Sequence, residues 1–141
     1  MSSPKVVLFN SQEFGNAAIA KLAEGFTIDM MRERMPGVDL YEFSVDELPM
    51  ADADFEAAWK VDPSGPRVVV DLPLAKTVTK ARLRFERKLL LESLDIAFMK
   101  AQESGLPTHE IAAEKQRLRD ITLLPDACST IEQLRALKAA Q

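Results

Sequence analysis

The chain has 141 residues, of which 47% are hydrophobic, and a formal net charge of −4. This composition is typical of a folded protein and argues against a disordered chain. The mildly acidic balance argues against a general nucleic-acid binder. The single cysteine, Cys128, excludes an internal disulfide and a cysteine-rich metal cluster. We find no membrane-spanning apolar run and no signal-peptide pattern, so we expect a protein made in the cytoplasm.

The first 71 residues predict a small unit of mixed secondary structure. Three segments are rich in β-branched and aromatic residues or alternate apolar and polar side chains, which predicts strands at 5–9, 38–43 and 67–71. Three further segments have helical spacing, namely 17–22, 26–35 and a single turn around 55–59. The run Pro63-Ser64-Gly65-Pro66 predicts a tight turn before the last strand.

Residues 72–104 predict one long helix. Pro73 follows Asp71 and suits the first turn of a helix, where a missing N–H is tolerated. The next helix-breaking residues are Gly105 and Pro107, which together form a stop signal. A helix of about thirty residues is roughly 45 Å long. Because a small chain cannot easily cover such a rod, the sequence indicates assembly with another polypeptide.

The rest of the chain predicts an antiparallel helical hairpin. Thr108 is a suitable N-cap for a return helix over 109–122, and a box from Ser129 to Glu132 opens a last short helix that ends near Ala139. Asp95 lies in an apolar run, so it is either solvated or paired with a cation of the return helix, Lys115 or Arg119. The residues expected to build the hairpin are Leu90, Leu94, Asp95, Leu118 and Arg119. The fold class is therefore α+β, with a small domain at 1–71 and a helical hairpin with a short C-terminal helix at 72–141.

Candidate chemical sites are weak by comparison. His109 is the only histidine and stands apart from any nucleophile motif, and the acidic residues between 46 and 56 lack the ligand pattern of a calcium loop. We therefore expect no enzyme, no catalytic residue, no cofactor and no metal. Six cations crowd the start of the long helix but surround it instead of forming one edge, which favours a solvated or protein-facing role over phosphate binding: Lys76, Lys80, Arg82, Arg84, Arg87 and Lys88.

Large apolar side chains supply the candidate partner interface. Phe55 and Trp59 are four residues apart and form either the core of the small domain or an anchor for a partner. Leu91 and Phe98 lie beside the packing stripe of the long helix and widen its apolar face. The candidate interface therefore consists of Phe55, Trp59, Leu91 and Phe98.

Four blocks in a fixed order resemble a family of small, mostly uncharacterised proteins of tailed bacteriophages and prophages, encoded among tail and tail-fibre genes. The matching residues are Phe55, Ala58 and Trp59, then Val70, Asp71, Pro73, Ala75 and Lys76, then Leu94, Asp95, Ala97, Lys100 and Ala101, and finally Lys115, Gln116, Leu118, Arg119 and Asp120. The last of these blocks, with Leu118, Arg119 and Asp120, is also similar to the Leu-Arg-Asp tail of phage tail-fibre assembly proteins.

The resemblance implies a non-enzymatic structural or assembly protein of the phage tail region that acts through protein–protein contacts. Its expected partners are other tail or tail-fibre proteins, in an oligomer or a complex, with no membrane and no nucleic acid. Its expected location is the virion, after synthesis in the host cytoplasm. The alternative is a nucleic-acid-associated phage protein that uses the basic start of the long helix.

Overall fold

A computed structural model describes residues 4–13 and 15–140. The chain divides into two compact units, Met1–Ala75 and Lys76–Gln141, so the boundary falls just inside the long helix instead of at residue 71. The N-terminal unit combines strands with short helices, and the C-terminal unit is helical. The predicted α+β class is confirmed.

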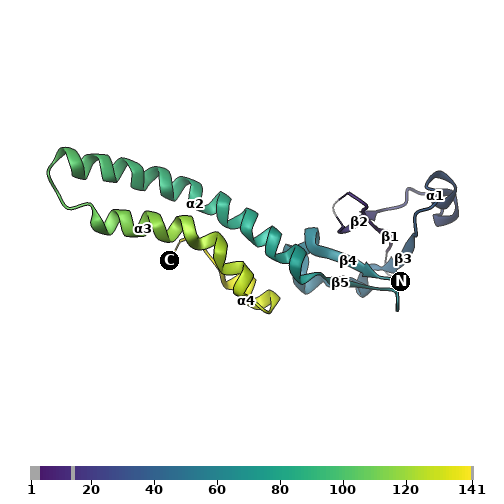
Figure 1. Ribbon diagram of the computed structural model, residues 1–141. Helices are drawn as coiled ribbons and strands as arrows, with labels where there is room; N and C mark the ends of the chain where they lie inside the picture. The colour runs from purple at the N-terminus through teal and green to yellow at the C-terminus, as the bar shows by residue number, and fades with distance from the viewer. Residues whose placement is uncertain (1–3, 14, 141) are drawn as a thin grey trace. The chain divides into compact units, whose positions relative to one another are not determined.

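The N-terminal unit contains a three-stranded antiparallel sheet in the order β2-β1-β3 (Figure 1). The strands are β1 (Lys5–Asn10), β2 (Ala17–Ala20) and β3 (Tyr41–Ser44). Strand β1 lies in the centre and buries the consecutive residues Val6, Val7 and Leu8. Burial of both faces explains why this strand has a continuous apolar run without alternation.

Strand β2 corrects the prediction of a helix at 17–22. Ala17 pairs with Asn10 and Ala20 with Val7, so the segment completes a hairpin with β1. The Ser11 amide donates to the carbonyl of Asn16 at 2.7 Å and closes the turn. Alanine favours helices by only a fraction of a kcal/mol per residue, which ladder hydrogen bonds and burial outweigh.

A second, two-stranded sheet follows the turn-rich segment. Its strands are β4 (Trp59–Asp62) and β5 (Arg67–Val70), joined by the predicted turn at 63–66. The expected helical turn at 55–59 is wrong at its end, because Trp59 is the first residue of β4. The preceding elements are α1 (Ile28–Arg34), as predicted, and the 3-10 segments η1 (Val45–Glu47) and η2 (Met50–Ala58). Strand β3 begins at Tyr41, later than the predicted residue 38.

Both sheets contribute to one core. The Asn10 side chain joins them, because its Nδ2 donates to the Val61 carbonyl at 2.9 Å and its Oδ1 accepts from the Val61 amide at 2.8 Å. The asparagine therefore acts as a strand partner for an edge residue of β4. The buried residues of this core are Val6, Leu8, Ala17, Phe43, Trp59, Val61 and Val68.

The long helix α2 (Leu72–Glu103) is confirmed almost to the residue. Asp71 caps its start, because the carboxylate accepts from the Leu74 amide at 3.0 Å. The helix ends in a Schellman turn at Gly105, whose φ is +69°. The amide of Leu106 donates to the carbonyl of Ala101 at 2.8 Å, and this 6→1 bond defines the motif.

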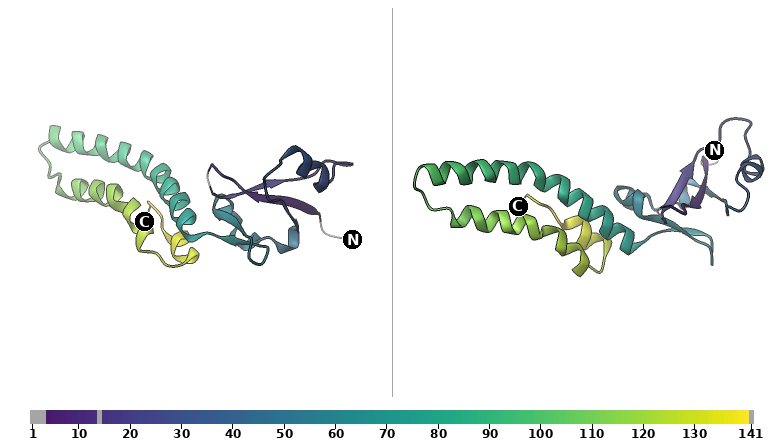
Figure 2. Two further views of the ribbon diagram at one scale, coloured as in Figure 1. Left: turned by 45° about the vertical axis from the view of Figure 1, so that its right-hand side comes forward. Right: turned by 45° about the horizontal axis from the view of Figure 1, so that its top comes forward.

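Three shorter helical elements complete the C-terminal unit. They are α3 (His109–Asp120), η3 (Ile121–Ala127) and α4 (Ile131–Ala136). Figure 2 shows α3 running back beside α2 in both views, as the short loop predicts. Thr108 precedes α3, but its side chain makes no cap hydrogen bond. The predicted box from Ser129 to Glu132 is displaced by one residue: Thr130 and Gln133 form it.

Candidate functional site

The hairpin of the C-terminal unit is built around a small apolar core. Leu83 from α2 and Leu118 from α3 are fully buried, together with Ile121 and Ala139. Leu90 and Leu94 pack against them from α2, where the sequence placed them. Arg117 fixes the segment around Ala139 against α3, because its Nη2 donates to the Ala139 carbonyl at 2.9 Å.

Asp95 pairs with Lys115, one of the two cations proposed for it. The Lys115 Nζ lies 2.7 Å from the Asp95 carboxylate and 5.0 Å from the centre of the Phe98 ring. Arg119 has a different role, since its backbone carbonyl accepts from Arg87 at 2.9 Å. The Asp95 side chain remains 58% exposed, so it is both paired and solvated.

The predicted partner interface does not form one exposed surface. Phe55 and Trp59 are only 3% and 2% exposed, and the Trp59 indole donates to the Asp52 carbonyl at 3.2 Å. Both belong to the interior of the N-terminal unit, which was the alternative for this pair. Leu91 is half-buried against the hairpin core, and Phe98 is half-buried with Lys115 over its ring. The four residues are therefore mainly structural in this chain.

The exposed apolar side chains of α2 lie elsewhere. Phe85, Leu89, Ile96 and Met99 are 81%, 70%, 56% and 59% exposed. We call these four residues the outer stripe of α2. The sequence contains a signal for these residues, since they recur at intervals of three, four or seven residues, but periodicity alone does not distinguish them from the stripe that packs inside the hairpin. Apolar surface of this kind marks interaction sites in folded proteins.

The basic start of α2 is mostly engaged within its own unit. Lys76 donates to the Asp126 carbonyl, and Lys80 pairs with the Asp126 carboxylate at 2.8 Å. Arg82 binds Glu86 and also donates to the Leu134 carbonyl. The further cation, Arg87, donates to the last carbonyls of α3. These contacts tie α2 to the elements that pack against it.

Two ion pairs perturb titration in this unit. The Lys80 ammonium donates to Asp126 and lowers the pKa of that carboxyl below its ordinary value. The hydrogen bonds from Arg117 lower the pKa of Glu114, and the same contact raises the pKa of Arg117. Each shift favours the charged pair, and neither prepares a group for proton transfer. The Lys80–Asp126 pair joins α2 to η3, whereas Glu114 and Arg117 form a pair within α3.

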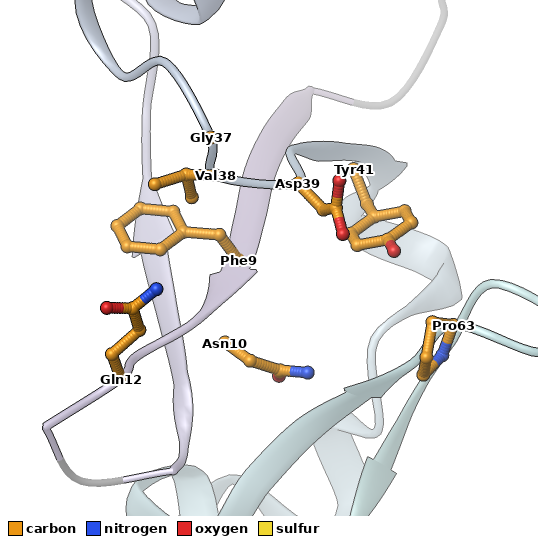
Figure 3. Close-up of a pocket in the computed structure, with 8 residues that line it drawn as sticks. All are labelled: Phe9, Asn10, Gln12, Gly37, Val38, Asp39, Tyr41 and Pro63. Atoms are coloured by element: carbon orange, nitrogen blue, oxygen red, sulfur yellow. The ribbon is translucent and has the colours of Figure 1, made fainter.

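A polar pocket of about 360 Å³ opens in the N-terminal unit (Figure 3). Its lining residues are Phe9, Asn10, Gln12, Gly37, Val38, Asp39, Tyr41 and Pro63. The amide of Asn10 is already used by Val61. Figure 3 shows the Asp39 carboxylate close to the Tyr41 ring, whereas Gln12 lies apart near Phe9. One carboxylate and one phenol supply no nucleophile with a base, so the pocket offers no recognisable reaction.

The other chemical candidates remain isolated. Over residues 4–13 and 15–140, no three His, Cys, Asp or Glu side chains come together as a metal site would require. Cys128 directs its thiol at the Leu124 carbonyl, 3.6 Å away. Within the same residues, no helix has both the length and the apolar character needed to cross a membrane.

Comparison with known proteins adds no match. No protein-family model, no curated protein and no solved structure is significantly similar to this chain.

Proposed function

We propose that this chain is a non-enzymatic structural or assembly protein of the tail region of a tailed bacteriophage, and that it acts through protein–protein contacts of its helical unit. The observation that carries the proposal is the outer stripe of α2, which leaves four large apolar side chains in solvent. Such a surface suits a protein whose exposed apolar side chains become buried when a partner protein binds.

The motif residues behind the phage resemblance support the same conclusion, because they serve the scaffold. Trp59 fills the N-terminal core, and Asp71 caps α2. The pair Asp95–Lys115 joins the two arms of the hairpin, and Leu118 is the centre of its core. Because these matching residues stabilise the fold, the resemblance reflects a shared fold. The function then depends on the surface that this fold presents.

The alternative, nucleic-acid binding by the basic start of α2, receives less support. Lys76, Lys80, Arg82 and Arg87 already bind groups of the same unit. Arg84 and Lys88 are exposed, and two cations release few counterions. A DNA mobility shift that disappears with added salt would favour this alternative, and no shift at low salt would remove it.

The experiment is mass spectrometry of purified phage particles from cells that produce the chain, together with a pull-down using the tail-fibre protein encoded nearby. A virion component should be found in the particle, and an assembly factor should be found only in the pull-down. Leu118→Asp, which places a charge in the hairpin core, should abolish either association. Gln12→Ala, an exposed change in the N-terminal unit, should not. Absence of the chain from both samples would contradict the proposal.

A further inference from the structure

Helix α2 has two apolar faces, and its own unit covers one of them. With 3.6 residues per turn, the outer stripe of Phe85, Leu89, Ile96 and Met99 occupies an arc of about 80°. Leu83, Leu90 and Leu94 lie on the opposite side of the helix, where they contribute to the hairpin core. The outer stripe is therefore a separate surface and not the rim of the core.

The outer stripe has the spacing of a coiled-coil seam. Its residues follow the alternating four-and-three pattern of a heptad repeat, with Glu92 at the remaining position between Leu89 and Ile96. The seam from Phe85 to Met99 is about 21 Å long, or two heptads. A free helix of that length would be marginal, but α2 is already held by its hairpin. Association therefore requires little ordering of the backbone.

Charges beside the seam define the partner. Lys88 and Asp95 are both exposed on the same flank of the stripe, and they differ by one heptad. When two copies of this helix meet head to tail, equal flanks face each other, so Lys88 faces Asp95 of the second copy and the reverse also holds. The Asp95 carboxylate pairs with Lys115 of its own chain but is 58% exposed, so it can accept the second lysine as well. Leu89 then faces Glu92 of the second copy. In a parallel pair, Glu92 would face Glu92, which places like charges in the seam.

We propose that the outer stripe of α2 binds the outer stripe of a second copy of this chain, as an antiparallel two-stranded coiled coil centred between residues 90 and 91. The self-complementary charge pattern favours a second copy over an unrelated helix. The proposal deepens the proposed function, because it names a second copy of the chain as the partner at the outer stripe. Its tests use the isolated chain, so their failure is distinguishable from failure of the phage assignment, which is tested on particles.

The first test is sedimentation or light scattering of the full chain over a range of concentrations. We expect a species of twice the 15.7 kDa chain mass that dissociates on dilution. The double variant Leu89→Ser/Ile96→Ser should raise the dissociation constant at least 10-fold, since each residue contributes a large apolar contact. Both side chains are exposed in the single chain, so its helical circular dichroism should be unchanged. Leu123→Ser, which changes a leucine that is 65% exposed outside the stripe, is the matched control.

The second test determines the orientation, with one pair of cysteines on the flank of the seam and one cysteine in the seam itself at Met99. In a Cys128→Ser background, chains carrying Lys88→Cys are mixed with chains carrying Asp95→Cys and oxidised. Because Asp95→Cys removes the ion pair with Lys115, the helical circular dichroism of this variant is first compared with that of the parent chain. The antiparallel pair predicts that the two variants cross-link to each other. Met99→Cys alone should not cross-link to itself, because the two sulfurs would be about 25 Å apart along the axis. Self-cross-linking of Met99→Cys would overturn the orientation. A chain that stays monomeric at about 100 μM, or a dimer that the double variant leaves intact, would overturn the proposed interface.

Discussion

Replacement of Leu118 by alanine tests the hairpin core most directly. Leu118 is 1% exposed and belongs to the buried cluster with Leu83, Ile121 and Ala139. Truncation removes three buried carbon atoms and leaves a cavity, and in well-packed cores the two effects together cost about 2–5 kcal/mol. A unit of this size has a total unfolding free energy of about 3–10 kcal/mol. The substitution should therefore remove a large part of the stability of the C-terminal unit.

The two units allow the effect to be located. Trp59 is the only tryptophan and lies in the N-terminal core, so its fluorescence reports the unfolding of that unit. Far-UV circular dichroism is dominated by the long helices of the C-terminal unit. Because 1 kcal/mol corresponds to about 4–8 °C for a small domain, Leu118→Ala should lower the circular dichroism transition by about 10 °C or more. The fluorescence transition should stay in place.

The matched control is Leu123→Ala, which makes the same change at a leucine that is 65% exposed. It should alter the free energy of unfolding by less than about 0.5 kcal/mol. If Leu118→Ala costs less than about 1 kcal/mol, Leu118 is not the centre of a packed core. If both optical transitions shift equally, the two units unfold as one and the division between them has no thermodynamic meaning.

Three further changes probe other parts of the fold. Asn10→Ala leaves the amide and carbonyl of Val61 without a partner, so the fluorescence-detected unfolding free energy should fall by about 1–3 kcal/mol, and an unchanged urea midpoint would contradict the bridge between the sheets. Gly105→Ala forces a β-carbon into a φ of +69°, which should cost about 1 kcal/mol in thermal melts, and an unaltered melt would refute the Schellman turn. The ion pair with Lys80 lowers the pKa of Asp126, so its stabilising effect is complete above the ordinary value of 3.8 and is lost as the pH falls through the lowered pKa. An NMR titration should find the Asp126 pKa below 3.8, and Lys80→Met should raise it toward that value, while the charge of Lys76 still lowers it.

The long helix could be predicted because its limits are local. Asp71 and Pro73 define its start, and Gly105 provides the positive φ that ends it. These signals act within a few residues and need no knowledge of the tertiary fold. The turn at 63–66 and the strand that follows were predictable for the same reason.

The strands β2 and β4 could not be predicted because their conformation depends on distant partners. The alanine-rich segment of β2 favours a helix by propensity, and only pairing with β1 makes it a strand. Phe55 precedes Trp59 by four residues, which is also the spacing of two neighbouring side chains on one face of a helix. The structure instead places Trp59 opposite Val70, a partner that lies beyond the following turn. Pairing across such separations leaves no periodic signal in a short segment.

The exposed surface of α2 was the hardest feature to identify, for a physical reason. The helix is apolar on two sides, and periodicity alone does not tell which side its return helix will cover. The sequence predicts Leu91 and Phe98 on the partner surface, but the loop after Gly105 brings α3 against that side of α2. Because the short helix α3 covers only one face of α2, the outer stripe on the opposite face remains exposed. The motif residues form caps, cores and an interhelical ion pair, and the outer stripe is a second apolar face of α2 that remains exposed. Exposed apolar faces of this kind serve recognition in folded proteins, which is the role that we propose for the stripe.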